Sequence, residues 1–219
     1  MVAVAALQTT LFAQGQPGVL CDARVERMAL DEHSWLDLAR NWLGGADRLL
    51  ADLATSLTWR CGRRPMYGSL VDDPRLSATI DLEADSTAVV VRDMASWLDA
   101  SYLEAIDSVW VNYYRDGRDS VAWHSDRVGR TQVNPIVAIV SLGGPRRFLL
   151  RPMEGPAAVQ LVLGSGDLLV MGGACQHGWE HTVPKMAGAP PRMSVTLRRR
   201  EGIFDPAEDW WPDAGPQPR

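Results

Sequence analysis

Apolar positions in the first half of the chain recur at three- and four-residue steps in two places. Over residues 31–55 these steps predict two helices separated at Gly44-Gly45, and over 94–106 they predict a further helix. Residues 56–92 mix short apolar stretches with Arg, Pro, Gly and Asp, which favours short strands and loops. Residues 1–30 show little periodicity and contain Gly, Pro and Gln, so we expect an extended N-terminal arm there.

After residue 107 the pattern changes to short β-rich runs separated by turn residues. Such runs in close succession favour an antiparallel sandwich or jelly roll over alternating strand and helix units. Because the helices precede these strands in the chain, the expected fold class is α+β. The runs are SVWVNYY, SVAWHS, PIVAIVSLG, RRFLLR, AVQLVLG, GDLLVMG, EHTVP and RMSVTLRRR.

Length and composition favour a single folded unit. A chain of 219 residues with 46% hydrophobic content can bury one sizeable core. We therefore expect an N-terminal arm over 1–30, one domain over 31–200, and a flexible, acidic, Pro-rich tail over 201–219. Within the domain, the helices and a lid are expected over 31–107 and the jelly-roll core over 108–200.

Charge, cysteines and hydropathy exclude several classes of protein. A net charge of −5 argues against broad electrostatic coating of nucleic acid, so any nucleic-acid site must be local. The three cysteines, Cys21, Cys61 and Cys175, are far apart and form no CxxC pair, so neither a disulfide framework nor a thiolate zinc site is indicated. No apolar run reaches the roughly 18 residues that a membrane span needs. A cytoplasmic, unexported protein is expected.

A candidate metal site is formed by histidines and an aspartate in the β-rich half. In the segment VAWHSD, His124 and Asp126 are two positions apart near a strand end, so both can face the same side. A distant histidine would complete a two-histidine, one-carboxylate set, which leaves coordination positions open and suits non-haem Fe(II). His177 and His181 both qualify by type. We choose His181, because WEHTVP reads as a strand whereas His177 lies in a glycine-flanked turn.

Two arginines near the end of the β-rich half point to a bound anion. Arg192 and Arg198 flank MSVTL at an even spacing, so both guanidinium groups face one side of a strand. A buried arginine pair needs an anionic partner, and a dicarboxylate suits the bidentate geometry of arginine. Asn112 and Tyr114, also two positions apart, offer an amide and a phenol on one face of another strand.

From about Val109 to Arg200 the chain resembles the AlkB-type 2-oxoglutarate oxygenases, a family that removes N-alkyl lesions from nucleic-acid bases. The matching segments, in order, are NYYRDGRDSVAWHSD, IVSLGGPRRFLLR, GDLLVMGG, WEHTVPK and RMSVTLR. The resemblance implies a double-stranded β-helix (jelly-roll) core with the N-terminal helices packed on one sheet. It implies Fe(II), 2-oxoglutarate and O2 as cofactor and co-substrates. It also implies iron ligation by His124, Asp126 and His181, and 2-oxoglutarate binding by Asn112, Tyr114, Arg192, Ser194 and Arg198.

Ser194 stands where many members of the family have Asn, which puts one co-substrate hydrogen bond in doubt. Two other departures concern the substrate. Val128 stands where many members have an acidic base-reading residue, and the lid after Tyr67-Gly68 has no aromatic residue. Base stacking must then come from other side chains. The candidate substrate-binding residues are Trp59, Tyr67, Trp123, Ser125 and Arg147.

The expected function is oxidative demethylation of N-alkylated bases in DNA, with release of formaldehyde, succinate and CO2. We expect a monomer. We also expect single-stranded DNA as the substrate, because the target base must be unpaired or flipped to reach the iron. The alternative is the same oxygenase chemistry on RNA, a protein side chain or a small metabolite. The acidic net charge and the missing lid aromatics permit that alternative. A jelly-roll binding module without catalysis is disfavoured, because all three metal ligands and both arginines occur together.

Overall fold

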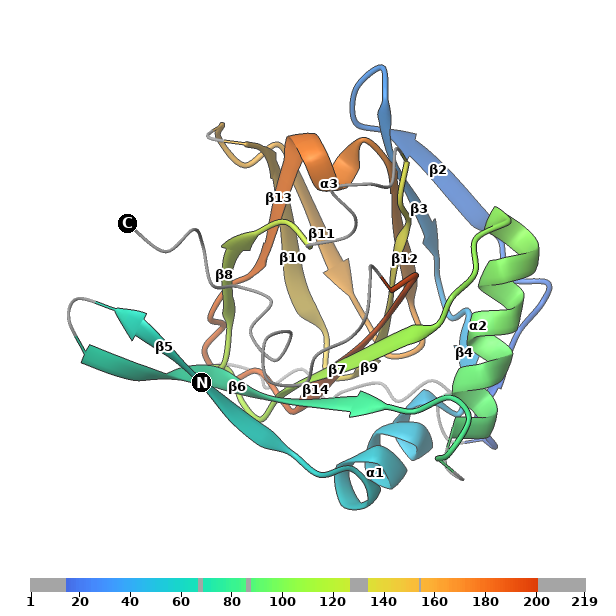
Figure 1. The fold of residues 1–219 in the computed structure, drawn as a ribbon, viewed down its shortest axis with the longest axis horizontal. Helices are drawn as coiled ribbons and strands as arrows, with labels where there is room; N and C mark the ends of the chain where they lie inside the picture. The colour runs from blue at the N-terminus through green and yellow to red at the C-terminus, as the bar shows by residue number, and fades with distance from the viewer. Residues whose placement is uncertain (1–14, 67–68, 86–87, 127–133, 154, 201–219) are drawn as a thin grey trace, which may run out of the picture.

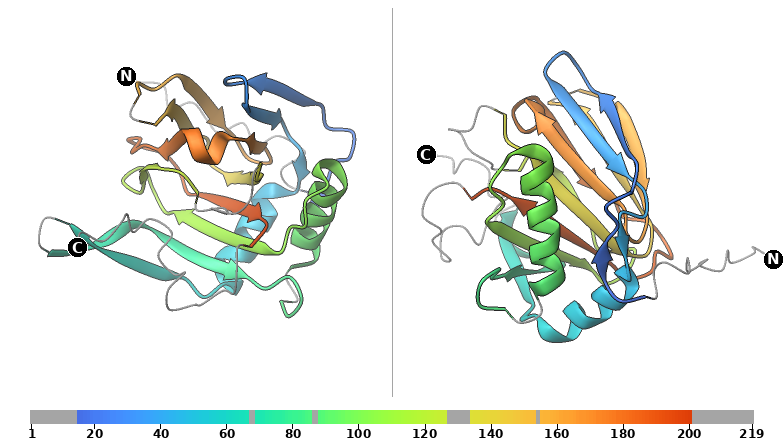
Figure 2. Two further views of the ribbon diagram at one scale, coloured as in Figure 1. Left: turned by 45° about the horizontal axis from the view of Figure 1, so that its top comes forward. Right: turned by 90° about the vertical axis from the view of Figure 1, so that its right-hand side faces the viewer.

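Two antiparallel sheets face each other and two helices cover the outer side of the larger one (Figure 1 and Figure 2). This computed structural model describes residues 15–66, 69–85, 88–126, 134–153 and 155–200. None of the helices in these ranges has the length and apolarity to cross a membrane.

The larger sheet has eight strands in the order β2-β3-β12-β9-β14-β7-β6-β5. Its strands come from both halves of the chain, and every neighbouring pair is antiparallel. Their bounds are β2 Val25–Ala29, β3 Ser34–Ala39, β5 Arg60–Met66, β6 Ser69–Ile80, β7 Ser108–Tyr114, β9 Val137–Gly143, β12 Leu168–Gly173 and β14 Arg192–Arg198.

The smaller sheet has four strands in the order β11-β10-β13-β8 and lies opposite the central part of the larger one (Figure 1). Its strands are β8 Val121–His124, β10 Arg146–Pro152, β11 Val159–Leu163 and β13 Trp179–Val183. A two-stranded pair joins β1 Gly18–Val19 to β4 Leu43–Gly44. The helices are α1 Ala46–Ser56, α2 Val89–Tyr102 and the short α3 Cys175–Gly178.

The core consists of two layers, because the central strands are covered on both faces. In β9, Val137 and Ile139 belong to the cluster between the two sheets, whereas Ala138 and Val140 belong to the cluster beneath the helices. Side chains alternate across a strand, so a strand covered on both faces reads as a continuous apolar run. This arrangement explains the run VAIVSLG, and it confirms the sequence-based expectation of a jelly-roll core with helices packed on one sheet.

The predicted helix over the first part of 31–55 is wrong, because Ser34–Ala39 forms strand β3. Ala39 packs in the helix-side cluster and Leu36 in the cluster between the sheets, so this strand is also buried on both faces. Its buried Asp37 accepts two hydrogen bonds from Arg27 and one from the Tyr102 hydroxyl. A short apolar run buried on both faces has no periodicity that distinguishes helix from strand.

The other element predictions are largely confirmed. The break at Gly44-Gly45 is correct, because α1 begins directly after Gly45, whose φ is 62°. The helix expected over 94–106 lies at 89–102, and all the β-rich runs after residue 107 are strands. Residues 56–92 form longer strands than expected, since β5 and β6 make an extended hairpin at one edge of the large sheet (Figure 1). The predicted tail over 201–219 lies outside the described residues, and the domain boundaries stay a prediction.

Candidate metal and co-substrate site

A cavity between the two sheets brings together the three residues that the sequence suggests as metal ligands. His124 ends β8, Asp126 follows it in the loop, and His181 lies in β13 directly opposite His124. A β-bulge in β8 sets their orientation. Between paired positions, β8 advances from Val121 to His124 while β13 advances only from His181 to Val183. The extra residue turns both Val121 and His124 into the cavity, although their odd spacing would place them on opposite faces of a regular strand.

The three candidate ligands form a tight cluster. One ligand atom from each of His124, Asp126 and His181 lies within 4.8 Å of the other two. The two imidazole rings are 4.2 Å apart between centroids, and His181 Nε2 lies 3.7 Å from Asp126 Oδ2. Phe148 stacks on His181 at 5.1 Å. In the described part of the chain this is the one group of at least three such side chains close enough to share an ion.

The chemistry of this cluster fits a divalent transition metal. His124 Nδ1 lies 2.8 Å from the Ala122 carbonyl oxygen, which can only accept, so Nδ1 carries the proton and Nε2 is free for a metal. Asp126 Oδ2 is buried and has no hydrogen-bond partner among the described residues. A buried carboxylate oxygen without a donor is costly unless a cation binds it. Two imidazoles with one carboxylate suit Fe(II) and leave coordination positions for other ligands.

Strand β14 forms the polar wall of the same cavity. Arg192, Ser194 and Thr196 line the cavity, whereas the intervening Met193 and Val195 pack in the helix-side cluster. This alternation follows from the two-residue period of a strand. Neighbouring β7 presents Asn112 and Tyr114 in the same way. The remaining lining residues are Val121, His124, Asp126, Ile139, Phe148, His181 and Val183.

Arg192 is a buried cation without a counterion in the described residues. Its side chain is 1% exposed, its Nε donates to Ser141 Oγ at 3.0 Å, and one terminal nitrogen has no hydrogen-bond partner. Burial lowers the pKa of Arg192 to about 10, and the guanidinium is therefore still charged at neutral pH. A buried charge of this kind needs an anion, and a carboxylate of 2-oxoglutarate fits the requirement.

Asn112 is held by three donors on one oxygen. Its Oδ1 accepts from Arg75 Nε at 3.0 Å, from Ser77 Oγ at 2.9 Å and from Trp110 Nε1 at 3.2 Å. Because these donors identify the carbonyl oxygen of the amide, the Asn112 NH2 group is the one turned away from them. Asn112 lines the cavity, so this group can donate to an anion bound there.

Arg198 differs from Arg192 in its surroundings. Its side chain is 20% exposed, and one terminal nitrogen lies 3.9 Å from Asp126 Oδ1. It therefore lies beside the candidate metal ligand, nearer to solvent than Arg192. The two arginines share a side of β14, as their even spacing predicts, but only Arg192 lines the cavity.

The candidate substrate-binding residues are not brought together. Trp59 packs on Tyr113 at 5.2 Å and donates to the Ala54 carbonyl, away from the cavity. Trp123 lies under the Arg151 guanidinium, at 4.3 Å. Arg147 is exposed, on the opposite face of β10 from the cavity-lining Phe148. Ser125 is partly buried between the two ligands His124 and Asp126, and Tyr67 lies outside the described residues.

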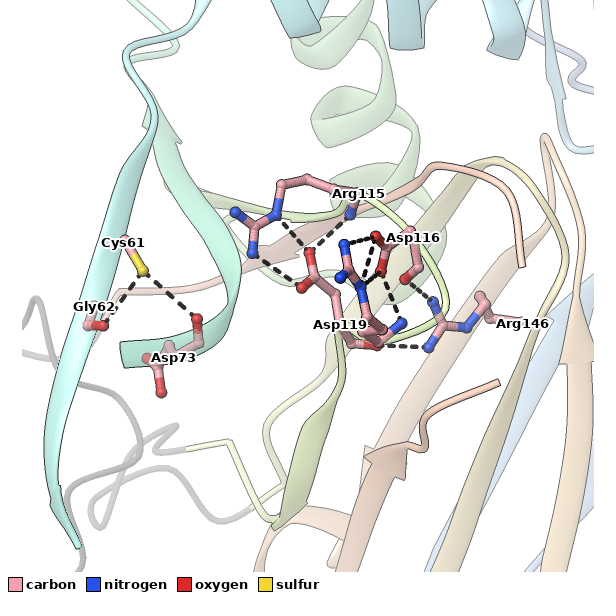
Figure 3. Close-up of polar contacts among 8 residues, drawn as sticks. Cys61, Gly62, Asp73, Arg115, Asp116, Asp119 and Arg146 are labelled. Atoms are coloured by element: carbon pink, nitrogen blue, oxygen red, sulfur yellow. Dashed lines mark hydrogen bonds and ion pairs between the residues drawn. The ribbon is translucent and has the colours of Figure 1, made fainter. Parts of the chain in front are cut away.

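Arg146 holds the β7–β8 loop and the segment after β13 by hydrogen bonds, and both of these segments adjoin a strand that carries a candidate metal ligand (Figure 3). Its guanidinium, which is 1% exposed, donates to the carbonyl oxygens of Asp116 and Asp119 in the β7–β8 loop and of Pro184 after β13. Within the first loop, Arg115 pairs with Asp119 (Figure 3). Burial lowers the pKa of Arg146. Arg146 is thus a structural residue of the smaller sheet.

Several residues of the site were not found by sequence reasoning. Ser141, which supports Arg192, was detectable as the polar residue in an otherwise apolar strand. Arg75 and Ser77, which hold Asn112, lie in a strand that carried no clear pattern. Gln176 accepts a hydrogen bond from the Asp126 backbone N–H at 3.0 Å, and no sequence signal distinguishes it.

Comparison with known sequences agrees with this geometry. The sequence model of the 2OG-Fe(II) oxygenase superfamily matches residues 51–200. The chain is 29% identical over 174 residues to the alpha-ketoglutarate-dependent dioxygenase alkB homolog 3 of Mus musculus, covering 70% of this chain and 61% of that protein. It is 34% identical over 116 residues to the DNA oxidative demethylase ALKBH2 of Arabidopsis thaliana, covering 42% and 37%. The chain thus spans less than two thirds of these relatives.

Comparison with solved structures supports the fold. A structure of OsALKBH1 matches with a TM-score of 0.57 at 15% identity, covering 80% of this chain and all of that one. A prolyl hydroxylase from Trichoplax adhaerens, in complex with a peptide fragment of hypoxia inducible factor, matches with a TM-score of 0.57 at 16% identity. That match covers 74% of this chain and 82% of the other. At these identities the likeness concerns the fold alone.

Proposed function

The chain belongs to the 2OG-Fe(II) oxygenase superfamily and is of the AlkB type, and on this premise we propose that it oxidatively demethylates N-alkylated bases in DNA. The family uses Fe(II), 2-oxoglutarate and O2. The observation that carries the proposal is one cavity that contains both a buried, donor-free Asp126 oxygen and a buried Arg192 without a counterion. The first fits the metal and the second fits the co-substrate.

The candidate metal ligands and the polar residues around them have distinct roles in this proposal. His124, Asp126 and His181 hold the iron, which when bound supplies the oxidising chemistry by coupling O2 activation to decarboxylation of 2-oxoglutarate. Arg192 binds a co-substrate carboxylate, with Ser141 fixing its Nε and Tyr114 beside it. The Asn112 NH2 group and Ser194 donate to the co-substrate from the same wall. Arg198 acts beside Asp126, where it both orients that carboxylate and adds positive charge.

The names of the relatives support a nucleobase as the proposed substrate. One relative is named a DNA oxidative demethylase, and others are alkB homologues. The base must leave any duplex to reach a cavity between two sheets, so single-stranded DNA is the favoured substrate. Ser125 lies between the ligands His124 and Asp126 in the sequence, and it is the substrate-binding candidate that we retain. Trp59 and Trp123 are engaged elsewhere, so they are not proposed to stack on the base.

A single incubation tests the proposal. Single-stranded oligonucleotides that contain 1-methyladenine or 3-methylcytosine are incubated with the full chain, Fe(II), 2-oxoglutarate and ascorbate, and the products are identified by mass spectrometry. We expect loss of the methyl group with an equal amount of succinate. Turnover of 2-oxoglutarate without demethylation of either base would overturn the nucleobase assignment and favour RNA, a protein side chain or a metabolite as substrate.

A further inference from the structure

Asp126 differs from the two histidines in how its backbone is held. His124 and His181 lie in paired strands, where cross-strand hydrogen bonds fix the main chain. Asp126 lies beyond the end of β8, and its backbone N–H donates to the side chain of Gln176 at 3.0 Å. In the part of the chain that the structure describes, this is the one hydrogen bond found for the Asp126 main chain.

Gln176 is itself held firmly. Its side chain is 5% exposed, and its Nε2 lies 3.8 Å from Met171 Sδ, so the amide has little freedom to turn. The residue belongs to α3, which precedes β13 directly (Figure 1). The N–H of Ala174 donates to the His33 carbonyl, and the indole of Trp179 donates to Asp31 Oδ2 at 2.6 Å. The start and the end of α3 are therefore both tied to the loop before β3.

We propose that Gln176 is a positioning residue for the metal site, which joins the loop carrying Asp126 to the segment that leads into His181. The inference rests on the proposed metal assignment. An amide suits this role because its oxygen accepts the Asp126 N–H without adding a second negative charge beside a buried carboxylate. Partners that orient metal ligands typically change metal affinity by about 10–100-fold when they are removed.

The test compares two substitutions at this position by calorimetric titration of the folded, full-length chain with Mn(II) in place of iron. Gln176→Met keeps the size of the side chain but removes the acceptor, and we expect Mn(II) to bind about 10–100-fold more weakly. Gln176→Glu keeps an oxygen acceptor at the same reach, so it should bind Mn(II) at least tenfold more tightly than Gln176→Met. Gln160→Met, an exposed glutamine on β11, is the matched control and should bind as the wild type does.

The outcomes separate this inference from the metal assignment. If Gln176→Met melts at a lower temperature but binds Mn(II) with wild-type affinity, Gln176 is merely structural and the inference is wrong. Equal loss in Gln176→Met and Gln176→Glu would also overturn it, because the acceptor would then not matter. If the wild type itself binds no Mn(II), the metal assignment fails first. No nucleic acid is needed, so failure of the demethylation assay leaves this test intact.

Discussion

Two histidines four positions apart differ completely in environment. His181 is 5% exposed, stacks on Phe148 and faces His124, whereas His177 is exposed on α3. A metal ligand needs to converge with the other ligands, and exposure on a different element prevents this for His177. The pair thus provides a matched test of the proposed ligand set.

Alanine at His124, Asp126 or His181 should each abolish metal-dependent turnover and weaken Mn(II) binding beyond detection, because each change removes one of three protein ligands. His177→Ala should bind Mn(II) and turn over as the wild type does. Calorimetry and succinate formation measure both effects. Metal loss in His177→Ala with retention in His181→Ala would refute the ligand assignment.

Substitution of Arg192 should separate stability from co-substrate binding. Arg192→Met removes a buried charge that lacks a counterion, so without 2-oxoglutarate the melting temperature should stay equal or rise. Affinity for 2-oxoglutarate should fall by about 2–5 kcal/mol, the range for truncating one partner of a buried charge pair. Arg198→Met should cost less, because that side chain is 20% exposed. Unchanged 2-oxoglutarate affinity in Arg192→Met would contradict the anion assignment.

Some residue-scale features of the site follow from sequence and others do not. The even spacing of Arg192 and Arg198 predicts a shared side of β14, because side chains alternate along any strand. Gln176 could not be predicted, since its contact with Asp126 joins α3 to the loop after β8 and depends on the tertiary fold. Trp123 was a plausible stacking residue by type, but Arg151 of β10, two strands away in the smaller sheet, lies over its ring.

At the scale of elements, the strands after residue 107 could be predicted because each run is bounded by turn residues and fits one strand. Strand β3 could not, since burial on both faces removes the alternation that would identify it. The bulge in β8 is also invisible in the sequence, although it turns His124 into the cavity. The His-x-Asp spacing predicts a shared face from the alternation of a regular strand. In the structure Asp126 lies beyond the end of β8, and the bulge is what turns His124 into the cavity.

The loops around the smaller sheet depend on Arg146, and a conservative change should reveal this. Arg146→Lys keeps the charge, but one ammonium cannot reach the three carbonyl oxygens that the planar guanidinium contacts. Each buried carbonyl left unpaired costs about 1–3 kcal/mol, which corresponds to roughly 2–4 °C in melting temperature per kcal/mol for a chain of this size. Arg147→Lys, at the exposed neighbouring position, is the control. Equal melting temperatures for the two variants would show that Arg146 is not a structural anchor.

At the scale of the whole molecule, the three cysteines report on the integrity of the two-sheet core. Cys21 and Cys61 are exposed, whereas Cys175 is 2% exposed and burial raises the pKa of its thiol to about 12. In mildly alkaline buffer, iodoacetamide should therefore alkylate the first two in the native protein and Cys175 only after unfolding. Mass spectrometry of the peptides measures this. Modification of Cys175 at the rate of Cys61 would mean that the core opens readily.

The acidic charge of the whole chain limits how it can bind DNA. The net charge is −5, and in the described residues Arg63, Arg115, Arg118 and Arg151 are paired with carboxylates, which makes them less available for phosphate contacts. Each phosphate contact with a single strand adds about 0.7 to the slope of log affinity against log salt. A chain that makes few such contacts should therefore bind single-stranded DNA weakly, with a slope of roughly 2–3 in magnitude.

Duplex DNA should bind and react less well than single-stranded DNA, because extrusion of a base costs a few kcal/mol that few phosphate contacts can offset. Fluorescence anisotropy over a salt series, with single- and double-stranded forms of one methylated sequence, measures affinity and slope together. Succinate formation on the same substrates measures turnover. A steep salt dependence, or faster turnover on the duplex, would contradict this prediction. It would mean that a local cluster of basic side chains contacts the DNA phosphates despite the negative net charge.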